Sequence, residues 1–175
     1  VEQARKVLNS MAVLALKNLK RSISLFNDYS EKKFSKVERD ENLIDRFETA
    51  IGNYLLKITA ADINETSNDL VIEMLHSVSD FERISDHCMN VAEVAKRNFE
   101  NDIKFSEEGI KELKVIGDAV TEILTMAVKA YSERDLETAL NIEPLELVID
   151  SINFTLKDTH VKRLCEGTCS VEGGI

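Results

Sequence analysis

Pairs of acidic residues four positions apart recur along this sequence and are its most informative chemical feature. Residues i and i+4 lie on one face of a helix, one turn apart, so each pair presents two carboxylates to the same side. Three of these pairs are candidate ligands: Glu41 and Asp45, Glu82 and Asp86, and Glu146 and Asp150. Carboxylate oxygens suit hard cations such as Mg²⁺, Mn²⁺, Ca²⁺ and iron. The repetition indicates either a cation site that several helices share or a common ancestry of these segments.

The two pairs in the first half of the chain lie at the edge of apolar helix faces. Around the first pair, the apolar stripe advances by threes and fours and includes Glu41 and Glu48. Around the second pair, Val78, Glu82 and Asp86 lie along one flank. An acid on such a stripe is costly unless it is paired, hydrogen-bonded or bound to a metal. If the two helices are antiparallel neighbours, their carboxylates converge. We therefore predict that the six paired acids are ligands of a divalent or ferric ion (Mg, Mn or Fe).

Two other interpretations of these residues stay open. Arg46, Lys57, Arg83 or solvent can satisfy the carboxylates as ordinary surface ion pairs, which would make the protein a helical scaffold without metal. The pattern Glu73-x-x-His76 is typical of bundle-core di-iron enzymes, but such enzymes need a second copy and the sequence has none. No Gly-rich phosphate loop, nucleophile elbow or Ser/His/Asp arrangement is present. The sequence therefore does not predict an enzyme.

Long amphipathic helices are expected to position these acids. The chain has one Pro and six Gly and little of the alternation typical of strands, which favours an all-α fold. Ser106, followed by two glutamates, is a predicted N-cap. Pro144 predicts a kink or a late start in the last helix. Apolar periodicity predicts five helices, over about 2–28, 31–60 and 69–98, then one that begins after Ser106 and one over about 133–164.

The two halves of the chain repeat each other. Tyr29-Ser30-Glu31 matches Tyr131-Ser132-Glu133, and the acidic pair at Glu41 matches the pair at Glu146. The predicted domains are 1–100 and 101–175. The counterpart of the third helix would fall beyond Ile175, so the second domain is expected to lack its third helix. Two antiparallel helices leave an apolar groove, which a swapped helix in a homodimer or a helix from a partner would fill.

The charge balance and the cysteine count narrow the class of partner. A net charge of −10 argues against nucleic acid, because phosphate neutralisation needs clustered Lys and Arg. No apolar run reaches the length of about 18 residues that a membrane span requires, so this segment is not expected to insert into a membrane. The basic cluster Lys17, Lys20 and Arg21 is interpreted as a solvated helix face. Three cysteines without a disulfide framework indicate a reducing, intracellular setting, and the spacing of Cys165 and Cys169 is not that of a zinc ribbon.

One stretch of the third predicted helix carries a family resemblance. It reads Asp80-Phe-Glu-Arg-Ile-Ser-Asp-His-Cys-Met-Asn90, followed by Val91-Ala-Glu. This resembles the signature of the PhoU family of phosphate-uptake regulators. The segment that begins Arg163-Leu-Cys-Glu-Gly-Thr-Cys-Ser resembles the loop before the last helix of that family. The resemblance implies an all-α tandem of antiparallel three-helix bundles, with the last helix of the second bundle missing from this chain. It also implies metal-binding Glu/Asp-x-x-x-Asp motifs, three of which coincide with the acidic pairs.

The resemblance further implies a non-enzymatic regulator of phosphate transport. Such a domain would lie in the cytoplasm at the inner face of the cell membrane, and its partner would be the membrane domain or the subunits of a phosphate transporter. Ile44-Asp45 followed by Tyr54-Leu55, together with the opening helix around Met11, looks closer to the cytoplasmic C-terminal PhoU-like domain of bacterial Na⁺/phosphate cotransporters. A start at Val1 agrees with excision from a longer membrane protein. The alternative is a free-standing phosphate-uptake regulator of a phosphate ABC transporter.

Overall fold

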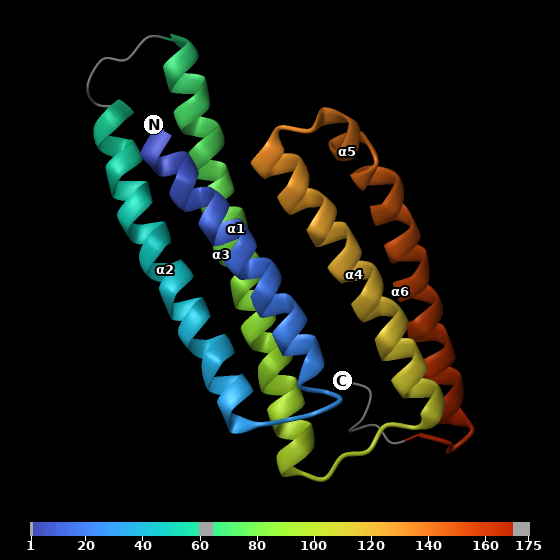
Figure 1. Cartoon of the computed structure of the whole chain (residues 1–175). Coiled ribbons are helices and arrows are strands. Elements are labelled where there is room, and N and C mark those ends of the chain that lie inside the picture. The colour runs from blue at the N-terminus through green and yellow to red at the C-terminus, as the bar shows by residue number, and fades with distance from the viewer. Residues whose placement is uncertain (1, 60–64, 170–175) are drawn as a thin grey trace. The chain divides into compact units, whose positions relative to one another are not determined.

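The computed structural model describes residues 2–59 and 65–169, and this part of the chain folds into helices and loops with no strand (Figure 1). The helices are α1 (Glu2–Ser24), α2 (Glu31–Thr59), α3 (Glu65–Glu100), α4 (Glu107–Glu133), α5 (Leu136–Leu140) and α6 (Ile142–Cys165). The predicted all-α fold is confirmed. None of the described helices combines the length and the hydropathy that crossing a bilayer would require.

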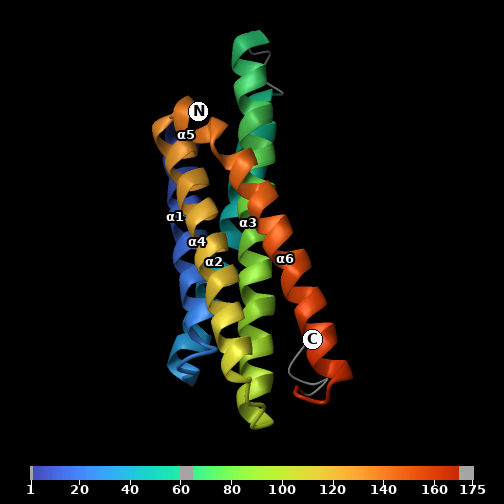
Figure 2. The same ribbon diagram turned by 90° about the vertical axis from the view of Figure 1, so that its right-hand side faces the viewer.

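The chain forms two compact units, over Val1–Ala95 and Lys96–Ile175. In the first unit, α1 and α2 are antiparallel and both run alongside α3 (Figures 1 and 2). The core of this unit consists of apolar side chains at helical spacing on all three helices. Its buried members include Leu8, Met11, Ala15, Leu19, Val37, Ile44, Leu55, Val71, Val78, Cys88 and Ala92. Burial of these apolar stripes is what holds α2 and α3 together and fixes which of their faces meet.

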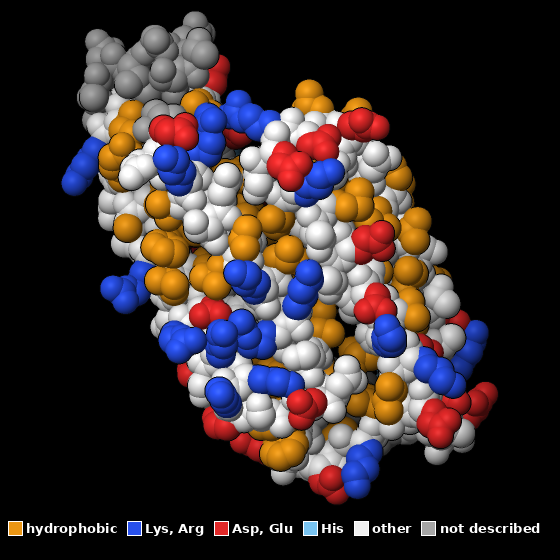
Figure 3. Space-filling model, in the orientation of Figure 1, with side chains coloured by type: hydrophobic (Ala, Val, Ile, Leu, Met, Phe, Trp, Pro, Cys, Tyr) orange, Lys and Arg blue, Asp and Glu red, His pale blue; other side chains and the backbone are white. Residues whose placement is uncertain are grey.

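Buried polar contacts join α1 to α2 within the first unit. The side-chain amide of Asn18 is fully buried and donates to the backbone carbonyl of Val37 at 3.0 Å. Arg21 donates to Asp40 at 2.7 Å and to the side-chain oxygen of Asn18 at 2.8 Å. Arg21 is therefore part of the helix interface and does not belong to the solvated basic face that was predicted for it. Lys17 is exposed, as that prediction requires. Lys and Arg side chains gather on this face of the unit, with hydrophobic side chains between them (Figure 3).

The second unit contains α4, α5 and α6. Ser106 caps α4 as predicted, because its hydroxyl accepts the backbone N–H of Gly109 at 3.1 Å. The last predicted helix is divided: α5 ends at Leu140 and α6 begins at Ile142. Pro144 thus lies in the first turn of α6, where a missing N–H is tolerated, and it marks a late start rather than a kink. No residue of α6 is buried, and Phe154 on this helix is 77% exposed.

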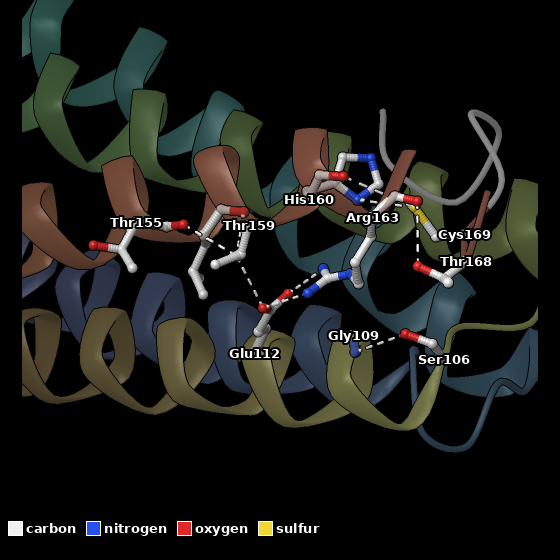
Figure 4. Close-up of polar contacts among 10 residues, drawn as sticks. Ser106, Gly109, Glu112, Thr155, Thr159, His160, Arg163, Thr168 and Cys169 are labelled. Carbon is white, nitrogen blue, oxygen red and sulfur yellow. Dashed lines mark hydrogen bonds and ion pairs between the residues drawn. The ribbon is translucent and has the colours of Figure 1, made fainter. Parts of the chain in front are cut away.

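One charged pair joins α4 to α6 (Figure 4). Both terminal guanidinium nitrogens of Arg163 donate to the carboxylate of Glu112, one of them at 2.7 Å, and the hydroxyl of Thr159 donates to the same carboxylate at 3.0 Å. Hydrogen bonding to Arg163 holds the pKa of Glu112 below its ordinary value, because these bonds favour the charged form. These bonds of Glu112 with Arg163 and Thr159 are the main polar contacts between α4 and α6, in a unit with few buried apolar side chains.

Candidate metal centre

Three carboxylates from two helices meet at the surface of the first unit. Asp45 and Glu48 come from α2 and Glu82 comes from α3, and one oxygen from each lies within 4.8 Å of the other two. Asp45 and Glu48 are three residues apart and so share a helix face. Packing of α2 against α3 brings Glu82 opposite that face. Asp45 is exposed, while Glu48 and Glu82 are half-buried.

Two further carboxylates adjoin these three. Asp86, one turn after Glu82 on α3, acts electrostatically on both Glu82 and Glu41. Asp45 also acts on Glu41, which lies one turn before it on α2. The cluster therefore contains five acidic side chains: Glu41, Asp45, Glu48, Glu82 and Asp86. We refer to these five as the carboxylate cluster.

The carboxylate cluster makes ionisation of two of its members, Glu41 and Glu82, unfavourable. Burial raises the pKa of Glu82 above its ordinary value, and the charges of Asp86, Glu48 and Asp45 raise it further. Burial likewise raises the pKa of Glu41, and here Asp45 and Asp86 add the electrostatic part. Both effects penalise the charged form of the acid. A cation bound among these oxygens would reverse the electrostatic effect.

Basic side chains do not neutralise the cluster. Within residues 2–59 and 65–169, no Lys, Arg or His forms an ion pair with any of the five acids. The hydroxyl of Ser79 makes a long hydrogen bond of 3.5 Å to Glu48. Arg46 and Arg83, which were candidates for ion pairs, are exposed. The interpretation as ordinary ion pairs therefore finds no basic partner for these carboxylates among the described residues.

The donor set and its spacing fit a hard cation. Two oxygens on opposite sides of a metal ion are separated by twice the metal–oxygen distance. This separation is about 4.8 Å for Ca²⁺ and about 4.1 Å for the smaller Mg²⁺. The three oxygens of Asp45, Glu48 and Glu82 lie within the larger of these spans, that of Ca²⁺. Oxygen-only ligands favour Mg²⁺, Mn²⁺, Ca²⁺ or ferric iron over softer metals. The residues present therefore fit the ion that the sequence predicts.

The structure gathers four of the six predicted ligands and adds one. Glu41, Asp45, Glu82 and Asp86 belong to the carboxylate cluster. Glu48 was not among the predicted ligands, because neither residue four positions away from it is acidic. Two features of the sequence could have indicated Glu48. It lies on the inward stripe of α2, and it follows Asp45 by three residues, which places both on one helix face.

The third predicted pair lies in the second unit and stands apart from any such group. Glu146 and Asp150 are both exposed on α6. In the described part of the second unit, no group of three acidic, His or Cys side chains brings its ligand atoms within 4.8 Å of one another. A metal site at Glu146 and Asp150 remains a prediction.

Comparisons with known proteins show the family of this chain. The family model described as the PhoU domain matches residues 8–95, which include the whole carboxylate cluster. The chain is 29% identical over 167 residues to PhoU homolog 1 of Thermotoga maritima, described as a phosphate-specific transport system accessory protein. This match covers 94% of the chain and 71% of that relative.

Two more matches agree with this one. A PhoU homolog of Clostridium acetobutylicum with the same description is 23% identical over 155 residues, which is 87% of this chain and 69% of the relative. The crystal structure of PhoU from Pseudomonas aeruginosa superposes with a TM-score of 0.88 at 23% identity, over 98% of this chain and 82% of that one. The structural match shows that the two chains share a fold.

Proposed function

Because the chain belongs to the PhoU family, we propose that it acts as an accessory regulator of a phosphate transport system. The descriptions of the matched relatives from Thermotoga and Clostridium support this proposal. The regulator acts without catalysis of its own, through contact with the membrane domain or subunits of the transporter at the cytoplasmic face of the membrane.

Of the two subtypes weighed from the sequence, the free-standing regulator has the better support. Both matched relatives are described as accessory proteins of a phosphate-specific transport system, and neither is described as a cotransporter. The resemblance to a cotransporter domain, based on Tyr54-Leu55 and the opening helix, has no match to support it. We therefore propose the free-standing form, which was the alternative interpretation of the sequence.

We further propose that the carboxylate cluster binds a hard cation. The observation that carries this proposal is the convergence of Asp45, Glu48 and Glu82 from two helices, without a basic side chain of the described residues to neutralise them. Glu48 and Glu82 supply the half-buried ligands, and Asp45 supplies the exposed one. Glu41 and Asp86 add negative charge beside the ion. A bound cation would cross-link α2 to α3 and favour the charged form of every acid in the cluster.

Calorimetric titration with Mn²⁺, Mg²⁺ and Fe³⁺ tests the metal site. We expect the wild-type chain to bind at least one of these ions and Glu48→Gln with Glu82→Gln to lose at least about tenfold in affinity. Glu73→Gln is the matched control, because Glu73 is an exposed acid elsewhere on α3. If the double variant binds as tightly as Glu73→Gln does, the cluster is not the site, and the scaffold without metal becomes the better account.

The regulatory role is tested separately, in the host of this protein. Deleting the gene should alter phosphate uptake, and an affinity-tagged copy should co-purify with subunits of the phosphate transporter. Co-purification lost in Glu48→Gln with Glu82→Gln would tie the cation to the partner contact. Unchanged uptake in the deletion strain, together with no transporter subunit in the purified material, would contradict the role.

A further inference from the structure

A cavity in the second unit has no part in the proposed function. It has a volume of about 490 Å³ and opens between the start of α4 and the C-terminal end of α6. Its lining combines cationic, imidazole, hydroxyl and thiol groups. The side chains that matter here are those of Lys104, Ser106, His160, Arg163, Thr168 and Cys169.

A reversal of the chain after α6 brings a thiol into this cavity. Gly167 has a φ of +69°, which a glycine adopts without strain. The N–H of Gly167 donates to the carbonyl of Leu164 at 3.1 Å, and the N–H of Thr168 donates to the carbonyl of Arg163 at 3.0 Å, as in a Schellman cap. The hydroxyl of Thr168 reinforces this turn through a bond of 3.2 Å to the same carbonyl. The turn returns the next residue, Cys169, towards α6.

Cys169 then lies beside a base and a cation (Figure 4). Its Sγ is 3.7 Å from Nδ1 of His160 and 3.9 Å from the carbonyl oxygen of the same residue. Hydrogen bonding to Glu112 raises the pKa of Arg163, and Cys169 contributes to that rise, so the thiol and the guanidinium are close enough to interact. Imidazole and cationic groups near a thiol stabilise its thiolate, which is the reactive form.

The other two cysteines lack this environment. Cys88 is buried in the first unit, and burial raises the pKa of its thiol to about 12. Cys165 is exposed on the last turn of α6, and within residues 2–59 and 65–169 its thiol has no hydrogen-bond partner. Exposure alone would therefore make Cys165 the most reactive cysteine, whereas the surrounding groups favour Cys169.

We propose that Cys169 is a site of oxidative modification by hydroperoxides. The thiol proton moves to Nδ1 of His160 when the ring carries its own proton on Nε2. The thiolate sulfur then attacks one oxygen of the peroxide, the O–O bond breaks, and a sulfur–oxygen bond forms. The departing oxygen takes up the proton and leaves as water or an alcohol. Sulfur loses two electrons, the peroxide gains them, and Cys169 becomes a sulfenic acid.

Site-resolved mass spectrometry of the whole chain tests this assignment. The reduced protein is treated with limiting hydrogen peroxide and a dione that traps sulfenic acids. We expect trapped product at Cys169 to exceed that at Cys165 by at least about tenfold, with none at Cys88. Equal or greater product at Cys165 would overturn the proposal, since exposure alone would then govern reactivity.

Three variants separate the environment from the thiol itself. His160→Gln should lower the rate at Cys169 by at least about tenfold, whereas His87→Gln, at an exposed histidine in the first unit, should leave it unchanged. Gly167→Ala keeps every lining side chain but strains the turn, so it should reduce the preference for Cys169 while circular dichroism stays helical. A rate at Cys169 that neither His160→Gln nor Gly167→Ala lowers would contradict the assignment. Metal binding at the carboxylate cluster is independent of either result.

Discussion

We expect Glu82 to have opposite effects on the stability of the protein with and without a bound cation. Its pKa is raised, chiefly by burial and then by Asp86 and Glu48. The folded state therefore holds a proton that the unfolded state releases near the ordinary value of 4.5. Without metal, the contribution of Glu82 to the free energy of unfolding is therefore greatest below pH 4.5, and it falls as the pH rises through the raised pKa of Glu82 in the folded state. At higher pH, the folded protein carries the full cost of the ionised Glu82.

Replacing Glu82 should consequently stabilise the metal-free protein. We expect Glu82→Gln to raise the free energy of unfolding at neutral pH by about 0.5–1 kcal/mol, as two like-charge contacts are removed. The gain should shrink as the pH is lowered towards 4.5, which denaturant unfolding at several pH values would show. With Mn²⁺ present the order should reverse, because only the wild-type chain gains from binding. A variant that is less stable without metal would show that Glu82 has a stabilising partner instead.

Asp40 has the opposite role, as a charge with a partner at the interface of α1 and α2. Its carboxylate accepts a hydrogen bond from Arg21 at 2.7 Å, and both side chains are largely buried. We expect Asp40→Ala to lower the free energy of unfolding by about 2–4 kcal/mol, because the charge of Arg21 is left without its carboxylate. Arg39→Ala is the control: its guanidinium is 72% exposed and 3.8 Å from Asp40, so its loss should cost less than about 1 kcal/mol. A double-mutant cycle of Asp40 with Arg21 measures the coupling, and a coupling near zero would contradict this account.

Among the elements, α4 and α6 depend on polar contacts more than the helices of the first unit do. No residue of α6 is buried, so the bonds of Glu112 to Arg163 and Thr159 carry a large share of their association. The pKa of Glu112 is lowered, mainly by Arg163. The stability that Glu112 contributes is fully present above pH 4.5, the ordinary pKa of a glutamate. It is lost as the pH falls from there through the lowered pKa of Glu112 in the folded state.

Glu112→Gln should therefore destabilise the second unit. We expect a loss of about 1–3 kcal/mol at neutral pH, which is the usual cost of a hydrogen bond to a charged group. Hydrogen exchange in α4 and α6 should accelerate, while Glu122→Gln, at an exposed acid of α4, should leave exchange unchanged. Acidification below pH 4.5 should bring the exchange of the wild-type chain closer to that of the variant. Equal exchange in both chains at neutral pH would show that apolar contacts suffice.

Helix type and position followed from the sequence where local rules decide them. The N-cap at Ser106 was predicted because a hydroxyl cap acts within one turn, and the late start at Pro144 was one of the two outcomes, with a kink, that a missing N–H predicts. The predicted helix from about 133 to 164 did not reveal the break between α5 and α6, since its apolar pattern continues across Asn141. Glu48 was not predicted as a member of the carboxylate cluster, because it has no acidic partner four residues away and its place there depends on which face of α2 packs against α3. The approach of Cys169 to His160 depends on a turn after α6 that periodicity does not describe.

For the whole molecule, we expect the two units to respond differently to metal. The carboxylate cluster lies in the first unit, and the described part of the second unit has no comparable group. Adding Mn²⁺ at about 100 times its dissociation constant should stabilise the first unit by about 2.7 kcal/mol. Hydrogen exchange should slow in α2 and α3 and stay unchanged in α4 and α6. Slowing confined to α6 would instead support the predicted pair Glu146 and Asp150.

The most direct test is anomalous X-ray diffraction from crystals of this protein soaked in Mn²⁺, recorded at the manganese absorption edge. The account predicts an anomalous peak between Asp45, Glu48 and Glu82, at about 2.2 Å from at least two of their oxygens. The peak should vanish in crystals of Glu48→Gln with Glu82→Gln and persist in Glu73→Gln. A fully soaked wild-type crystal with no peak at these three residues, or with the same peak in the double variant, would contradict the account.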